Sequence, residues 1–388
     1  FELFHGHSTS TASVQPGGLN LKQRCQQILA PADIKINGSR PWDMQIHDDR
    51  FYARVLAEGS MGLGESYMDG WWDAAALDEF FFRIFRTKLD EQSLTWRDGL
   101  TALKARIINQ QTIPRAFQIG RHHYDLGNDL YATMLDSQMI YSCGYWQDAS
   151  SLDQAQEAKL ELICQKLRLK PSMRLLDIGC GWGGMAAYAA RNYGVEVVGI
   201  TVSEEQASYA REQCRGLPVS IELRDYREQR GCFDRVVSIG MFEHVGHKNY
   251  RTFMEQQRDL LTEDGLVLLH TIGRNKTAPT IDKWINRYIF PNSMLPSAKQ
   301  ITCAADELFV IEDWHNFGTD YDTTLLHWFR NFDASFEKLP ASRYDQRFYR
   351  MWKYYLLSCA GSFRARRNQV WQIVLSPKGC LGGYHAPR

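Results

Sequence analysis

The second half of the chain alternates short apolar runs with segments in which apolar residues recur every three or four positions. This alternation predicts strands followed by helices, with helices beginning near Glu204 and Asn249. The runs that predict strands read MRLLDIG, VEVVGI, VSIELRD, FDRVVSIGMF, DGLVLLHTI, ELFVIEDWHNF and VWQIVLS. Strands that are apolar along their whole length are buried on both faces. We therefore predict an α/β fold built on a doubly wound, mostly parallel sheet.

A long amphipathic helix is predicted immediately before the first of these strands. It begins in SLDQ, where Ser151 and Gln154 have the spacing of a capping box. One face of the helix carries the apolar side chains of Leu152, Ala155, Ile163 and Leu167. We expect this face to lie against the sheet that follows.

The first third of the chain has a less regular pattern. Helical patches between 19 and 85 are interrupted by segments such as PADIKINGSRPWD, and we interpret the glycines of GSMGLGESYMDGWWD as loop turns. The stretch 86–121 is charged and weakly patterned, which is typical of a helix followed by a linker. Because 388 residues exceed the usual size of one hydrophobic core, we place a domain boundary in this stretch.

Charge and cysteine content exclude several classes of protein. Lys plus Arg number 45, as do Asp plus Glu, so no net charge attracts the chain to nucleic acid, and any attraction to a membrane must be local. The 9 cysteines include no CxxC pair and no zinc-like His/Cys cluster, which predicts a cytoplasmic protein without a metal site. No apolar run is long enough to span a membrane, and FELFHGHSTS does not resemble a signal peptide. The first residue is Phe1 rather than Met, which indicates that the true start is missing.

The segment LDIGCGWGG joins the first strand of the predicted sheet to the next helix, at the edge where such sheets bind ligands. Gly179, Gly181 and Gly184 fit GxGxxG, the spacing of a dinucleotide site. The alternative ligand is S-adenosylmethionine, whose cationic centre suits Asp177 at the strand end. A dinucleotide site also needs an acid about twenty residues later. Since the second strand ends at Thr201 without an acid, we favour S-adenosylmethionine.

The missing acid leaves other residues to hold the ribose of that ligand. Thr201 and Gln206 are the candidates, because they follow the second strand. Asp225 ends the third strand and is placed to accept from the adenine amine.

Several strings together carry a resemblance: HYDLGND, YSCGYW, LDIGCGWGG, GMFEHVG, LLHTIG, WHNFGTDYDTTL and YYLLSCAGSFRARR. The chain resembles the bacterial cyclopropane-fatty-acyl-phospholipid synthase family from about residue 20 to about residue 377. The resemblance implies methylene transfer from S-adenosylmethionine to the cis double bond of an acyl chain in membrane phospholipid. It also implies a sheet of the class I methyltransferase type, a smaller and mainly helical N-terminal domain, and a homodimer at the inner face of the cytoplasmic membrane.

The family's functional residues can be placed on this sequence. For S-adenosylmethionine the resemblance implies Tyr141, Ser142, Gly179, Gly181, Thr201, Gln206, Asp225 and Tyr226. For a bound bicarbonate ion it implies Cys143, Glu243, His270, the backbone of Ile272, and Tyr321. A second catalytic candidate is Cys359, in the motif SCAGSFR.

The implied reaction explains why such residues are needed. An unactivated alkene that attacks a sulfonium methyl leaves positive charge on carbon, so the pocket must be dry and a base must then remove a proton. We interpret Cys143 as one wall of an anion pocket rather than a nucleophile or a zinc ligand. A protonated His270 would balance the bicarbonate, and Glu243 would accept its hydroxyl proton or tune the histidine.

The resemblance also divides the chain. Residues 1–19 are predicted to be a disordered or non-native extension, 20–105 a lipid-associating or membrane-associating domain, 106–135 a linker with the start of the catalytic domain, and 136–388 the catalytic domain. Tyr67, Trp71 and Trp72 are candidates for membrane contact, with positive charge from FRARR at 363–367 and RHH at 121–123, and the alternative for each is ordinary core or solvated surface. The aromatic insertion around 288–295 is expected to cover an acyl tunnel.

Two other functions stay open at this stage. A related small-molecule N- or C-methyltransferase shares the glycine loop, and would methylate a soluble substrate. A non-catalytic lipid-binding module would bind vesicles without turnover, although the intact glycine loop and Glu243 argue against it.

Overall fold

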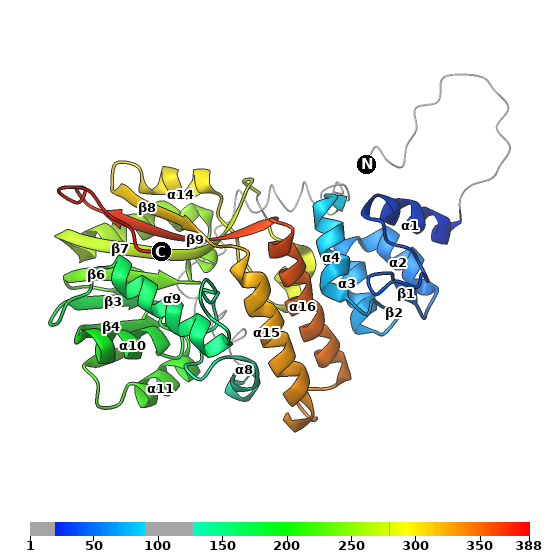
Figure 1. Cartoon of the computed structure of the whole chain (residues 1–388), viewed down its shortest axis with the longest axis horizontal. Coiled ribbons are helices and arrows are strands. Elements are labelled where there is room, and N and C mark those ends of the chain that lie inside the picture. The colour runs from blue at the N-terminus through cyan, green and yellow to red at the C-terminus, as the bar shows by residue number, and fades with distance from the viewer. Residues whose placement is uncertain (1–19, 90–126, 279) are drawn as a thin grey trace, which may run out of the picture.

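A computed structural model describes residues 20–89, 127–278 and 280–388, and Figure 1 shows how they are arranged. The centre of the fold is a 7-stranded sheet with the order β5-β4-β3-β6-β7-β9-β8. Its strands are β3 (Arg174–Ile178), β4 (Glu196–Thr201), β5 (Val219–Leu223), β6 (Phe233–Ile239), β7 (Leu261–Arg274), β8 (Val310–Asn316) and β9 (Asn368–Ser376). Every strand predicted from an apolar run is therefore present.

Strand direction also agrees with the prediction of a mostly parallel sheet. Strands β3 to β7 pair in parallel, whereas β9 is antiparallel to both β7 and β8. The order reverses at β3, which has β4 on one side and β6 on the other. The crevice at such a reversal, beyond the carboxyl ends of the strands, is where doubly wound sheets bind ligands.

Helices cover both faces of this sheet, as the apolar strands require. Neighbouring strand residues belong to opposite cores: Leu175 packs with α9 and α10, while Leu176 packs with α12 and α14. The helices around the sheet are α8 (Asn128–Met134), α9 (Leu152–Lys166), α10 (Gly184–Tyr193), α11 (Glu204–Gln213), α12 (Tyr250–Leu260), α13 (Lys283–Tyr288), α14 (Ala298–Ala305), α15 (Asp320–Ser335) and α16 (Gln346–Arg364).

The predicted helix before the first strand is α9, and its start confirms half of the expected capping box. The Ser151 side chain accepts from the backbone N–H of Gln154. The Gln154 side chain accepts from Ser150 instead of returning to Ser151. The apolar face is buried as predicted, and the helix also buries Gln156, Lys159 and Lys166.

A smaller helical unit, residues 20–89, lies beside α16 (Figure 1). It contains α1 (Leu21–Leu29), α2 (Arg50–Glu58), α3 (Ser60–Met68), α4 (Leu77–Arg86), and the short paired strands β1 (Gln45–Ile46) and β2 (Trp72–Asp73). The interpretation of all its glycines as loop turns was wrong, because Gly62 and Gly64 lie within α3. A Cβ on Gly64 would lie 2.3 Å from the Trp284 ring, so close helix packing requires this glycine.

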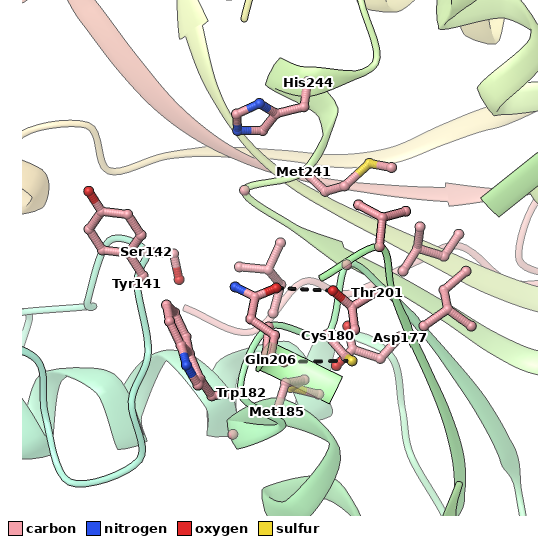
Figure 2. A pocket seen from close by; sticks show the side chains of 18 of the residues that line it. Tyr141, Ser142, Asp177, Cys180, Trp182, Met185, Thr201, Gln206, Met241 and His244 are labelled. Carbon is pink, nitrogen blue, oxygen red and sulfur yellow. Dashed lines mark hydrogen bonds between the residues drawn. The ribbon is translucent and has the colours of Figure 1, made fainter. Parts of the chain in front are cut away.

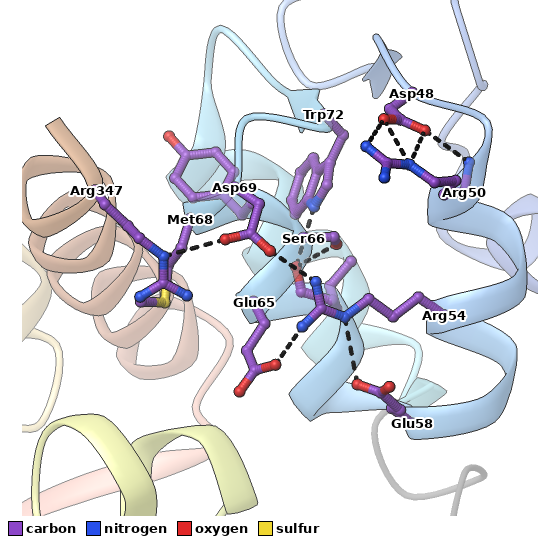
Figure 3. A network of polar contacts seen from close by, with 12 residues as sticks. Asp48, Arg50, Arg54, Glu58, Glu65, Ser66, Met68, Asp69, Trp72 and Arg347 are labelled. Carbon is purple, nitrogen blue, oxygen red and sulfur yellow. Dashed lines mark hydrogen bonds and ion pairs between the residues drawn. The ribbon is translucent and has the colours of Figure 1, made fainter.

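An ion-pair network joins the helical unit to the rest of the fold (Figure 3). Arg54 of α2 binds the carboxylates of Glu65 and Asp69, and Asp69 also binds Arg347 of α16. Glu65 accepts a 2.7 Å hydrogen bond from the hydroxyl of Tyr288 in α13. The unit is therefore held against α13 and α16 by polar contacts as well as by apolar packing.

The aromatic residues assigned to membrane contact are mostly in the core of this unit. Tyr67 and Trp72 are 1% and 0% exposed, because they pack on each other and on neighbouring rings. Trp71 is half-buried beneath the guanidinium groups of Arg50 and Arg54. The assignment of Tyr67 and Trp72 to a membrane surface was therefore wrong.

One of the three arginines in the positive segment FRARR is neutralised by ion pairs. Phe363 is buried, and Arg364 forms ion pairs with Asp78 and Asp322. The segment RHH at 121–123 lies outside the described residues. Within the described ranges, no helix has the length and hydropathy needed to cross a membrane.

Candidate functional site

A pocket opens at the carboxyl ends of β3, β4 and β6, where the strand order reverses. Figure 2 shows side chains from several separate segments converging on it. Its lining includes each predicted S-adenosylmethionine residue: Tyr141, Ser142, Gly179, Gly181, Thr201, Gln206, Asp225 and Tyr226. The structure thus brings together residues spread over 86 positions, from 141 to 226.

The glycine loop forms one wall of the pocket in a conformation that suits glycine. Gly179 has φ +82° and Gly181 has φ +54°, in the left-handed region that side chains disfavour. The loop is tied back to β4, because the backbone N–H groups of Gly179 and Cys180 donate to the carbonyl of Ile200. A ligand can therefore approach the loop backbone without meeting a Cβ.

Polar groups that could bind the ribose and the base of a nucleoside lie at the carboxyl ends of β4 and β5. The hydroxyl of Thr201 is 3.0 Å from the side-chain oxygen of Gln206, and both residues line the pocket (Figure 2). The carboxylate of Asp225 accepts two side-chain hydrogen bonds of 2.7 Å from Arg227. Arg227 therefore fixes the orientation of this carboxylate, which was not foreseen from the sequence.

The segment that carries Tyr141 and Ser142 is fastened to α9. The Gln156 side-chain amide donates to the backbone carbonyl of Ser142 at 2.8 Å, and Lys159 Nζ donates to the Ser142 hydroxyl at 2.9 Å. The Tyr141 hydroxyl lies 2.7 Å from that of Tyr355 in α16. Two distant helices therefore set the position of this segment.

Glu243 lies in a short 3-10 turn, Phe242–His244, that follows β6. One carboxylate oxygen accepts from the backbone N–H of Ile272 at 2.6 Å. The other oxygen, Oε2, is buried and has no partner among the described residues. Burial raises the pKa of Glu243 to about 7, against hydrogen bonds from Ile272 that lower it. The side chain is thus placed to accept a proton or a hydrogen bond from a ligand.

His270 lies on β7, on the same side of the strand as Ile272. It pairs across the sheet with Gln372, whose amide nitrogen lies 3.4 Å from His270 Nδ1. Burial lowers the pKa of His270 well below its usual range, and Lys159 and Lys166 add to this effect. This lowered pKa favours a neutral His270 over the protonated form that was expected, because burial and two nearby ammonium groups disfavour a positive charge.

Tyr321 belongs to the first turn of α15, and Cys143 is held against this helix. The backbone N–H of Gly144 donates to the Thr324 hydroxyl at 3.1 Å, which holds the neighbouring Cys143 on this helix. The Cys143 thiol is fully buried and donates to the carbonyl of Gly144. Burial raises the pKa of Cys143 well above its usual range, so the side chain is a thiol and not a thiolate nucleophile.

Direct contacts join only part of the predicted bicarbonate set. Glu243 touches Ile272, and Phe317, which precedes α15, packs its ring 5.7 Å from that of His270. Tyr321 lies 4 positions after Phe317, in the same apolar cluster as Cys143. The structure thus shows direct contact only between Glu243 and Ile272, while Phe317 brings His270 against the apolar cluster that contains Cys143 and Tyr321.

Cys359 packs against the same apolar cluster as Cys143 and Tyr321, but among the described residues no hydrogen bond joins it to the predicted bicarbonate set. It is half-buried in α16, one turn after Tyr355, and burial raises its pKa to about 12. The negative charge of Asp282 also raises this pKa, and a hydrogen bond with Ser358 opposes the effect. A neutral thiol in this position does not support a nucleophilic role.

The aromatic insertion around 288–295 contacts the turn that holds Glu243. The backbone N–H of Met294 donates to the carbonyl of Glu243 at 2.8 Å. The Phe290 ring lies edge-on to His244 and to Tyr355. The insertion thus contacts the turn that holds Glu243, while its expected role over an acyl tunnel stays a prediction.

Sequence reasoning missed Lys159, Gln372 and the arginine partner of Asp225. Lys159 follows Ala155 by four positions on the buried face of α9, and this spacing could have indicated it. The contact of Gln372 with His270 depends on strand pairing, which no local pattern shows. In the described part of the chain, no group of three or more His, Cys, Asp or Glu side chains is arranged to hold a metal ion.

The chain is similar in sequence to a known protein family and to characterised members of it. The mycolic acid cyclopropane synthetase family matches residues 111–373 of the chain. The cyclopropane-fatty-acyl-phospholipid synthase of Escherichia coli strain K12 is 53% identical over 363 residues, covering 93% of this chain and 94% of that protein.

The fold is also similar to that of solved cyclopropane synthase structures. The cyclopropane synthase MmaA2 from Mycobacterium tuberculosis is 30% identical with a TM-score of 0.64, covering 67% of this chain and 97% of that one. The mycolic acid cyclopropane synthase CmaA1, solved with SAH and CTAB, is 32% identical with a TM-score of 0.63 and the same coverages of 67% and 97%. The predicted type of sheet is confirmed.

Proposed function

This chain belongs to the mycolic acid cyclopropane synthetase family and is an S-adenosylmethionine-dependent methyltransferase, and from this premise we propose that it forms cyclopropane rings at cis double bonds of phospholipid acyl chains. The observation that carries the proposal is the 53% identity to a cyclopropane-fatty-acyl-phospholipid synthase over nearly the whole of both chains. The pocket supports it, because all eight residues assigned to the methyl donor line one cavity beside Glu243.

The pocket residues suit each part of S-adenosylmethionine, which supplies the one-carbon unit when bound. Thr201 and Gln206 would hold the ribose, and Asp225, fixed by Arg227, would accept from the adenine amine. Tyr141 presents an aromatic wall, and aromatic faces stabilise a nearby cation by about 1 to 2 kcal/mol when water is excluded. The same wall would favour the carbocation that forms on the acyl chain.

Bicarbonate is the proposed base, and the residues around Glu243 fit it. Glu243 Oε2 and Gln372 Oε1 are both buried without a partner among the described residues, so the site has spare acceptors. When bound, bicarbonate would supply a compact base for the proton that ring closure releases. Glu243 would accept its hydroxyl hydrogen, and neutral His270, with Nδ1 occupied by Gln372, would donate from Nε2.

Labelled donor distinguishes this proposal from the two alternatives. We expect radiolabel from S-adenosylmethionine to enter unsaturated phospholipid in vesicles, and mass spectrometry to show an added CH₂ with loss of the double bond. Saturated phospholipid vesicles are the matched control and should stay unlabelled. Label in a soluble amine would favour an N-methyltransferase, and vesicle binding without label would favour a lipid-binding module.

Cys143→Ser should keep substantial activity, within about tenfold of the unchanged enzyme, because a hydroxyl can still donate to an anion. Initial rates of ring formation measure this. Cys164→Ser is the matched control, since Cys164 is equally buried but lies in α9 outside the pocket. Near-complete loss in Cys143→Ser, with fold and donor binding intact, would count against the anion pocket.

We also propose that the enzyme acts as a homodimer at the inner face of the cytoplasmic membrane. The support for membrane contact is limited to the helical unit 20–89, where Leu21 and Ile28 are 47% and 42% exposed. These residues are seven positions apart and so share one face of α1. Attraction through a net charge is absent, since the chain has as many acidic as basic residues.

A further inference from the structure

Three buried polar side chains lie close together in the pocket wall. Lys159 comes from α9, Ser142 from the segment before it, and Asp177 from β3; Figure 2 shows the latter two. Lys159, Ser142 and Asp177 are 0%, 7% and 1% exposed. Lys159 lies close enough to both partners to bond the Ser142 hydroxyl and to interact with the Asp177 charge.

Each of these groups has unused hydrogen-bonding capacity. Within the described residues, Lys159 Nζ makes one hydrogen bond, to Ser142 Oγ at 2.9 Å, although an ammonium group has three N–H donors. Ser142 accepts in that bond, so its own hydroxyl hydrogen is available to an acceptor. Asp177 Oδ2 is buried and has no partner among the same residues. Two kinds of donor and one carboxylate therefore face the pocket.

Burial disfavours the charged forms of Lys159 and Asp177. Desolvation lowers the pKa of Lys159 to about 8 and raises that of Asp177 to about 7. The lysine cannot move away, because α9 holds it and also holds Ser142 through Gln156. The charges of Asp136 and Asp177 offset part of the desolvation of Lys159, but two of its N–H donors and the Asp177 Oδ2 atom make no hydrogen bond among the described residues. A ligand with a carboxylate beside an ammonium group would supply those hydrogen bonds.

We propose that Lys159, together with the Ser142 hydroxyl, binds the α-carboxylate of the methyl donor, which makes it a further donor-binding residue. Asp177 would then lie close to the α-ammonium group of the same donor. The inference rests on the proposed function, because that function supplies a ligand with a zwitterionic amino-acid end. A dinucleotide has no such end, so the same three groups also explain why this glycine loop serves S-adenosylmethionine.

Calorimetry with three adenosine thioethers tests the inference. S-adenosylhomocysteine has both charged groups, its decarboxylated analogue 5′-(3-aminopropylthio)-5′-deoxyadenosine keeps only the ammonium, and 5′-methylthioadenosine has neither. The unchanged enzyme should bind S-adenosylhomocysteine at least about tenfold more tightly than the decarboxylated analogue, as expected for a charge-assisted hydrogen bond. Lys159→Met should remove that preference and leave the affinity for the decarboxylated analogue within about twofold.

Lys166→Met is the matched control. Lys166 is a second fully buried lysine of α9, but it pairs with Asp313 at 3.3 Å and does not line the pocket. This variant should keep the preference for the carboxylate. Lys159→Gln, which keeps a donor to Ser142 without the charge, replaces Lys159→Met if the latter does not fold.

The outcomes separate this inference from the proposed function. If the unchanged enzyme binds none of the three compounds, the proposed function fails. If it binds S-adenosylhomocysteine but shows no preference over the decarboxylated analogue, only the role of Lys159 is overturned. Equal weakening of both compounds in Lys159→Met and Lys159→Gln would also overturn it, because that result indicates a structural role.

Discussion

Glu243→Gln should lower the rate of ring formation by roughly a hundredfold or more, the usual scale for removal of general-base catalysis. The amide can keep the hydrogen bond from the Ile272 backbone, since its oxygen can replace Oε1. It cannot take the proton that the buried Oε2 is placed to accept. Initial rates with labelled donor and unsaturated vesicles measure the loss, while calorimetry should show unchanged donor affinity.

Stability provides the control for this variant. The folded pKa of Glu243, about 7, lies above the unfolded value of 4.5, so the folded state binds more protons between these pH values. Stability from this group is therefore present at low pH and falls as the pH rises toward 7. A neutral glutamine avoids the loss, and at pH 8 the melting temperature of Glu243→Gln should equal or exceed that of the unchanged enzyme.

Dissolved carbon dioxide separates two roles for the same carboxylate. If Glu243 supports a bound bicarbonate, degassed buffer should slow the unchanged enzyme and added bicarbonate should restore its rate. A rate indifferent to both treatments would make Glu243 the direct base and would remove bicarbonate from the mechanism. Retained activity in Glu243→Gln would exclude both roles.

Gly179→Val should lower the affinity for S-adenosylmethionine by at least about a hundredfold. The backbone at Gly179 has φ +82°, a conformation that a β-branched residue strongly disfavours. A Cβ there would lie 2.9 Å from Met241, and the added methyl groups would enter the pocket that the loop lines. Calorimetry with the folded variant measures the change.

Gly216→Val separates the two effects of that substitution. Gly216 also has a positive φ, +79°, but nothing lies within 4 Å of its Cβ position and it does not line the pocket. This control should lose stability through backbone strain and still bind the donor. If Gly179→Val folds and binds normally, the glycine loop does not form the donor site.

The sequence predicted the sheet well because its signals are local. The central strands, such as β3 and β9, are short apolar runs whose burial on two faces needs no knowledge of their neighbours, whereas the edge strands β5 and β8 carry polar residues and are more exposed. The glycine loop could also be placed, since Gly179 and Gly181 follow a strand end directly. The resemblance then supplied the donor residues, and all eight line one pocket.

Local pattern failed where a contact came from a distant segment. Gly64 was predicted to be in a turn, but it lies within a helix. A glycine is needed there because the Trp284 ring occupies the space that a larger side chain would fill. Tyr67 and Trp72 have the composition of a membrane surface, yet the rings around them place both in the core. Neither the ring partners nor the helix contact can be deduced from neighbouring residues.

The sequence by itself therefore determined the order of strands and helices, the glycine loop and the residue types of the site. The tertiary structure alone decided the charge states and pairings within it. His270 is neutral because two lysines and complete burial surround it, and Lys159 joins the pocket because α9 lies against the segment of Ser142. Desolvation and proximity act through space, whereas periodicity along the chain records only which face of an element is buried.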